Sequence, residues 1–166
     1  MKTLLFIISL FLTANSFAQL PVWIQETGKP ETKLVVGKAY TKEEIIAKYG
    51  EPEEFETHDD EAFDGIISSY THDQLYIDLL ENKLIKFIFS NKQMELRMEC
   101  WDMTIKPGDD INKYWNLPKD KAYHIENFGN HLTLMVTING NQADIHLKLF
   151  YNKEKKIRSI VWFVPI

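Results

Sequence analysis

Cysteine, glycine and long hydrophobic runs are scarce in this sequence of 166 residues, and each scarcity excludes a class of protein. Cys100 is the single cysteine, so no disulfide can form within the chain, even in an oxidising compartment. Seven glycines leave little material for a loop that cradles a nucleotide or a phosphate. Beyond the N-terminal residues, no apolar segment approaches the roughly 18 residues that a membrane-spanning helix needs.

Motifs for catalysis and for metal binding are also missing. The sequence has no Gly-x-Ser-x-Gly turn, no His-Glu-x-x-His helix and no catalytic Cys/His signature. The net charge of −5 argues against a nucleic-acid partner, which needs a positive surface. We therefore expect a protein that is not an enzyme and that holds no cofactor, although a hydrolase whose catalytic residues converge from distant positions stays open.

The N-terminal residues have the pattern of a secretory signal peptide. Lys2 supplies the positive charge, the apolar segment from Leu4 to Leu12 is too short to span a bilayer, and Ser16 and Ala18 are small residues at a cleavage site. The residue directly after this site is Gln19 rather than cysteine, so a lipid anchor of the bacterial lipoprotein type is not expected. The sequence predicts a signal peptide over residues 1–18 and a periplasmic or secreted protein.

One short helix has both of its ends marked. Thr41 and Glu44 have the spacing of a capping box, while Gly50 and Pro52 end the helix and prevent it from resuming. The residues of its apolar face are Ile45, Ile46 and Tyr49.

Runs of Ile, Leu, Phe and Tyr at hairpin spacing predict four strands after this helix, at 66–70, 75–80, 84–89 and 94–101. The second half of the chain has a similar series, with the hairpin signal Asn139-Gly140 after a strand at 132–138. Apolar positions recur between the halves: Ile45, Tyr49 and Pro52 match Ile111, Trp115 and Pro118 at an offset of 66. This self-similarity indicates a tandem repeat, with units at 19–99 and 100–166.

The helix residues, together with Leu75-Tyr76-Ile77-Asp78 and Leu84-Ile85-Lys86-Phe87, resemble the SmpA/OmlA type of exported domain. Two such units in tandem are similar to the beta-lactamase inhibitor protein family. The resemblance implies an α+β fold, a tandem repeat of a short helix plus a four-stranded antiparallel meander, with the helices on one face of a continuous open sheet. The chain lacks the lipid-acceptor cysteine of the first family and the disulfide cysteines of the second, and no inhibitory residue is carried over.

Two charged segments have alternative interpretations. Residues 51–64 carry eight acids and no basic residue, which predicts a loop; His58, Asp59, Asp60, Glu61 and Asp64 could instead supply ligands to a metal ion. The basic run of Lys153, Lys155, Lys156 and Arg158 is predicted to be a solvated hairpin tip rather than an anion site.

Side chains that alternate with the apolar positions are predicted to share the uncovered side of the sheet. They mix aromatic rings, methionine, arginine and charges, as protein-recognition surfaces do, although a solvated sheet face has a similar composition. We expect a non-enzymatic module that binds an envelope or secreted protein there; the alternative is a small-ligand or metal-binding periplasmic protein that uses the acidic segment or a cleft between the repeats. The predicted contact residues are Tyr76, Arg97, Glu99, Trp101, Met135, His146 and Lys148.

Overall fold

The computed structural model describes residues 22–61, 64–138 and 141–164, so the predicted signal peptide and the Asn139-Gly140 turn lie outside the described residues, as does the Cys100 side chain. The chain forms two antiparallel sheets. The small sheet has the order β2-β1-β7-β8, with strands Lys29–Val35, Val22–Glu26, Met94–Met98 and Met103–Ile105. The large sheet has the order β3-β4-β5-β6-β12-β11-β10-β9. Its strands, in that order, are Glu54–Asp60, Gly65–His72, Leu75–Leu80, Lys83–Phe89, Ile157–Phe163, Asn141–Tyr151, His131–Ile138 and Ala122–Asn127.

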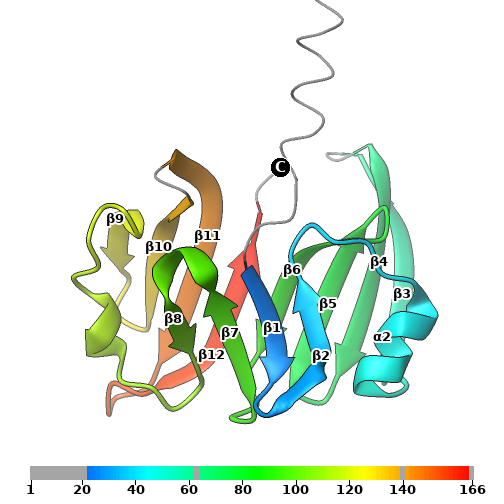
Figure 1. Ribbon diagram of the computed structural model, residues 1–166, viewed down its shortest axis with the longest axis horizontal. Helices are drawn as coiled ribbons and strands as arrows, with labels where there is room; N and C mark the ends of the chain where they lie inside the picture. Colours follow the sequence, from blue (N-terminus) through cyan, green and yellow to red (C-terminus); the bar gives the residue numbers. More distant parts are fainter. Residues whose placement is uncertain (1–21, 62–63, 139–140, 165–166) are drawn as a thin grey trace, which may run out of the picture.

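The core lies between the two sheets. Figure 1 shows the small sheet in front of the large one, whose strands run from β9 on the left to β3 on the right. Alternate side chains of each strand enter this space, because successive residues of a strand point to opposite faces. The buried residues of the small sheet include Val22, Ile24, Leu34, Leu96 and Ile105, and those of the large sheet include Ile77, Phe87, Leu134, Leu147 and Trp162.

The predicted helix is present as α2, Lys42–Tyr49, and its predicted capping box is confirmed. The backbone N–H of Glu44 donates to the Thr41 hydroxyl at 3.2 Å, and the Thr41 N–H donates to the Glu44 carboxylate at 2.8 Å. Ile45 is buried in the core, and the Tyr49 hydroxyl donates to the carbonyl of Thr32 on β2 at 2.7 Å. The helix therefore packs beside the edge of the small sheet.

The predicted fold class is wrong: the protein is mostly β, with two sheets rather than a repeat of a helix and a four-stranded meander. The sheet predicted to be open is covered on its inner face by β1, β2, β7 and β8. In the second half, the expected helix is only a 3-10 turn, η2, at Ile111–Tyr114. The strand predicted at 94–101 leaves the meander, because β7 pairs with β1 and β8.

The predicted acidic loop is also wrong, because Glu54–Asp60 forms the edge strand β3. This strand pairs with β4 along its whole length, from Glu54 opposite Thr71 to Asp60 opposite Gly65. An edge strand can keep almost every side chain in water, and charges on it oppose pairing with another chain. High charge therefore excluded a buried strand but not an exposed one.

Candidate functional site

The face of the large sheet that points away from the core carries a band of side chains, most of them half-exposed. The strand registers place Tyr76 opposite Ile88, Lys148 opposite Val161, and His146 opposite both Phe163 and Met135. We call this set the outer face; its members are Ser69, Tyr76, Asp78, Lys86, Ile88, Met135, His146, Lys148, Phe150, Val161 and Phe163. It crosses the β6–β12 pairing, where the two halves of the sheet join.

A hydrogen-bonded cluster lies on the β4–β6 part of the outer face. Asp78 has a buried carboxylate that accepts from the Ser69 hydroxyl at 2.7 Å and from the Lys86 ammonium at 2.9 Å. The Tyr76 hydroxyl donates to the Ser69 oxygen at 3.2 Å, and its ring lies 4.8 Å from the Lys86 ammonium. Burial, and after it the neighbouring Asp78 carboxylate, raises the pKa of Tyr76, so this phenol stays neutral. Each charge is paired, so the cluster fixes these side chains rather than activating a nucleophile.

Aromatic rings dominate the β10–β12 part. The rings of His146 and Phe163 are 4.9 Å apart, and the Lys148 ammonium lies 5.2 Å from the centre of the Phe163 ring. At the end of β10, His131 is stacked on Phe150 at 4.8 Å. Burial and the neighbouring Lys148 charge lower the pKa of His131. This part of the outer face therefore presents aromatic rings, with the Lys148 ammonium above the Phe163 ring.

The structure brings together four of the seven predicted contact residues and separates the other three. Tyr76, Met135, His146 and Lys148 lie on the outer face. Trp101 is only 1% exposed, within the 3-10 turn η1, Glu99–Trp101, and its indole N–H donates to the Thr137 carbonyl at 3.4 Å. It is therefore part of the core and is not available as the surface anchor that the sequence analysis expected.

Arg97 and Glu99 lie elsewhere. Arg97 is exposed on the small sheet, opposite Trp23 of β1 and Thr104 of β8, and Glu99 is exposed in η1. Because Arg97 points away from the core on the other sheet, it does not share a surface with Tyr76. Phe150, Phe163 and Ile88 belong to the outer face but were missed. Alternation within each strand could have found them, because it turns Phe150 outward with Lys148, Phe163 outward with Val161, and Ile88 outward between the buried Phe87 and Phe89.

A second polar cluster lies beneath Arg97 on the small sheet. Glu95 is 1% exposed, and its carboxylate accepts from Gln25 at 2.8 Å, from the Arg97 Nε at 2.8 Å and from the Lys106 ammonium at 2.9 Å. Desolvation raises the pKa of Glu95, but the hydrogen bonds from Lys106, Gln25 and Arg97 together outweigh it and hold the pKa below its usual range. A carboxylate held ionised and fully bonded is a poor general base, so this cluster is structural.

The acidic segment does not form a converging ligand set. Alternation along β3 turns Asp59 to the face opposite that of its neighbours His58 and Asp60. Within the part of the chain that the structure describes, no three His, Cys, Asp or Glu side chains are grouped closely enough to hold a metal ion. The alternative of a small-ligand or metal-binding protein stays a prediction.

None of the helices within residues 22–61, 64–138 and 141–164 has the length and apolar character needed to cross a membrane.

Comparison with known proteins does not place the chain in a family. No protein-family model matches it, and no curated protein matches it significantly. An extracellular protein containing an SCP domain from Bacillus anthracis str. Ames matches with 13% identity and a TM-score of 0.41, over 75% of this chain and 43% of that one. A DUF4309 family protein from Bacillus subtilis subsp. subtilis str. 168 matches with 10% identity and a TM-score of 0.36, over 80% of this chain and 82% of that one. The chain thus spans less than half the length of the first. Neither is described as an SmpA/OmlA or beta-lactamase inhibitor protein, so that resemblance stays a prediction.

Proposed function

We propose that this chain is an exported binding protein without enzymatic activity, which recognises an envelope or secreted protein through the outer face. The N-terminal pattern of Lys2, an apolar segment and a small-residue cleavage site supports export to the periplasm or the exterior. The absence of a catalytic motif from the sequence supports binding rather than catalysis.

The observation that carries the proposal is the composition of the outer face. Tyr76, Phe150 and Phe163 expose part of their rings there, beside aliphatic side chains such as Ile88 and Val161. Protein interfaces concentrate aromatic residues at their centre, and a few such residues carry most of the binding energy. The Asp78 cluster holds the neighbouring side chains in place, which lowers the entropy that is lost on binding.

The charges of this face indicate the chemistry of the partner. Lys148 lies over the Phe163 ring, and among the described residues no carboxylate is within 4.0 Å of its ammonium. A partner that brings an acidic group to Lys148 and an apolar side chain to the Phe163 ring would match both features. Such charge complementarity fixes orientation and accelerates association.

The test compares two matched surfaces. Phe163→Ala combined with Lys148→Glu removes a ring and its overlying cation from the outer face. Trp23→Ala combined with Lys33→Glu makes the same change on the small sheet, where the Lys33 ammonium lies 3.7 Å from the centre of the Trp23 ring. We expect the first variant to weaken capture of the partner from native envelope extracts by at least about thirtyfold, as loss of a hot spot of about 2 kcal/mol does.

The Trp23 variant should capture the same partner as the wild-type chain. Circular dichroism and melting of both variants check that each is folded. Capture that survives the Phe163 change and is lost with the Trp23 change would assign the binding surface to the small sheet and contradict the proposal.

A further inference from the structure

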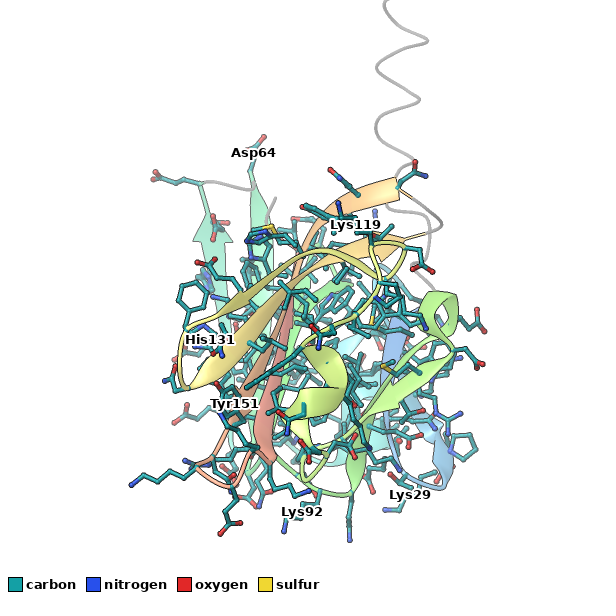
Figure 2. All side chains as sticks on the ribbon, turned by 90° about the vertical axis from the view of Figure 1, so that its left-hand side faces the viewer. Lys29, Asp64, Lys92, Lys119, His131 and Tyr151 are labelled. Atoms are coloured by element: carbon teal, nitrogen blue, oxygen red, sulfur yellow. The ribbon has the colours of Figure 1, made fainter. Side chains whose placement is uncertain are left out.

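Three neighbouring hollows lie at the end of the molecule that carries the β11–β12 hairpin, with volumes of about 440, 440 and 330 Å³. In Figure 2 this end lies at the bottom, where Tyr151 and Lys92 are labelled, below His131 and on the side opposite Asp64. Arg158 lines all three hollows. Five basic side chains and one acidic side chain line them in total: Lys92, Lys153, Lys155, Lys156, Arg158 and Glu154. A cationic surface of this size is unexpected in a chain of net charge −5.

The hairpin tip is held rigidly by its first residue. The Asn152 side-chain oxygen accepts from the backbone N–H of Glu154 at 3.0 Å and of Lys156 at 2.9 Å. Lys155 has a left-handed backbone, with φ of 62°, which closes the turn. The backbone from which the lysine side chains of this tip extend is therefore fixed.

Arg158 is presented by a β-bulge. Tyr151 pairs with Ile157 and Phe150 pairs with Ser159, so Arg158 is the extra residue of β12. A bulge changes the direction of a side chain relative to the regular pleat. Arg158 is exposed, and it lines both the hollow beside Asn130 and the hollow beside Lys92.

The cations differ in what already surrounds them. The Lys155 ammonium lies 4.9 Å from the rings of Trp115 and Tyr151, and the Lys156 ammonium is 4.0 Å from Asp110. Among the described residues, the Arg158 guanidinium has no carboxylate within 4.0 Å and makes no side-chain hydrogen bond.

Lys92 and Lys153 likewise have no carboxylate within 4.0 Å among the residues that the structure places. The carbonyl oxygen of the Asn152 side chain is already used, which leaves its amide N–H groups as neutral donors beside these cations. Unpaired like charges gathered in one place repel one another, and a bound anion relieves that repulsion.

We propose that this end of the molecule is a binding site for a phosphate or sulfate group, with Arg158 as its central contact. The planar guanidinium presents several N–H donors that match two oxygens of such an anion at once, whereas each lysine contributes a point charge. Each hollow is large enough for the anion and part of the molecule that bears it. The site does not depend on the outer-face function, since it needs no protein partner.

The direct test titrates the mature chain with sodium phosphate, sodium sulfate and sodium acetate at constant ionic strength, following the backbone amides of residues 152–158 and the Arg158 Nε–H by NMR. We expect saturable shifts with phosphate or sulfate. Arg158→Gln should weaken binding by about ten- to a hundredfold, the effect of losing a charge-assisted hydrogen bond. Arg158→Lys keeps the positive charge but loses the paired N–H donors of the guanidinium. Its affinity for the anion should lie between those of the wild-type chain and Arg158→Gln.

Lys119→Gln is the matched control. Figure 2 shows Lys119 near the end of the molecule opposite Lys92, and its removal changes the net charge by the same amount as Arg158→Gln. This control should bind within about twofold of the wild-type chain. Shifts that fail to saturate, or equal affinities of the Arg158 and Lys119 variants, would overturn the proposal and leave a solvated hairpin tip.

The source of the anion is resolved by two further probes, soluble polyphosphate and vesicles of phosphatidylglycerol in phosphatidylcholine. Both must lose binding with Arg158→Gln if the proposal holds. Preference for vesicles would identify a lipid headgroup, and preference for polyphosphate a soluble ligand. If phosphate binding persists while partner capture through Phe163 is absent, only the outer-face function fails.

Discussion

Trp101 is the residue whose position differs most from its prediction. Its indole is buried and hydrogen-bonded to Thr137 of β10, so it ties the turn after β7 to the large sheet. Alternation from Glu95 through Arg97 and Glu99 predicts that Trp101 points outward. The 3-10 turn that begins at Glu99 ends that alternation, and nothing in the local sequence marks the change.

Trp101→Ala should lower the free energy of unfolding by about 3–5 kcal/mol, because it removes a large buried side chain and leaves a cavity. Urea denaturation followed by circular dichroism measures the change. Trp23→Ala serves as the reference. Because Trp23 is only half-buried, this substitution should lower the free energy of unfolding much less. Equal losses for the two tryptophans would contradict the burial of Trp101.

Glu95 gives the protein a specific dependence of stability on pH. Since folding lowers its pKa below the ordinary value of 4.5, the unfolded chain takes up this proton first as the pH falls. The stabilisation is therefore complete well above pH 4.5 and is lost as the pH drops through the lower pKa of the folded state.

Glu95→Gln should lower the free energy of unfolding by about 1–3 kcal/mol at pH 7, because it leaves Lys106 and Arg97 without their carboxylate. At pH 3 the same substitution should lower it by less. Urea denaturation of both chains at pH values from 7 to 3 provides the comparison. Stability curves that stay parallel over this range would show that the carboxylate charge has no part in folding.

At the scale of elements, the helix was predicted well because its signals are local. The capping box, the glycine at its end and the following proline all act within one turn of the chain.

Thr41→Ala should lower the free energy of unfolding by about 1 kcal/mol, as loss of an N-cap does. Thr57→Ala, an exposed threonine of β3 with no cap to lose, is the control. A smaller loss at Thr41 than at Thr57 would argue against the cap as a source of stability.

Two edge strands, β2 and β3, show why some strands are hard to predict from the sequence. The charge of residues 51–64 predicts a loop where the edge strand β3 forms, and Pro30 lies within the edge strand β2. Proline and a high charge are tolerated where one side of a strand has no partner. Both features describe an edge as well as they describe a loop, so sequence alone does not separate the two.

At the scale of the whole molecule, the division into two sheets depends on pairings between distant residues. β1 pairs with β7, which brings Gln25 to Glu95 across 70 positions, and β12 pairs with β6. The apolar alternation of each strand predicts its buried side but not its neighbours. This is why the core faces of β5, β6, β10 and β12 could be predicted, whereas the covering sheet could not. Of the seven predicted contact residues, Arg97 lies off the outer face for this reason, because β7 pairs with β1 and β8, whereas Glu99 and Trp101 lie off it because of the 3-10 turn η1.

The proposed function requires a protein partner to bind on the outer face of the large sheet. The most direct measurement is photo-crosslinking with a benzoylphenylalanine placed at Val161 of the outer face or at Val35 of the small sheet, two half-exposed valines. We expect position 161 to form a covalent adduct with the captured partner and position 35 to form none. An adduct at position 35 with none at position 161 would contradict the proposed function.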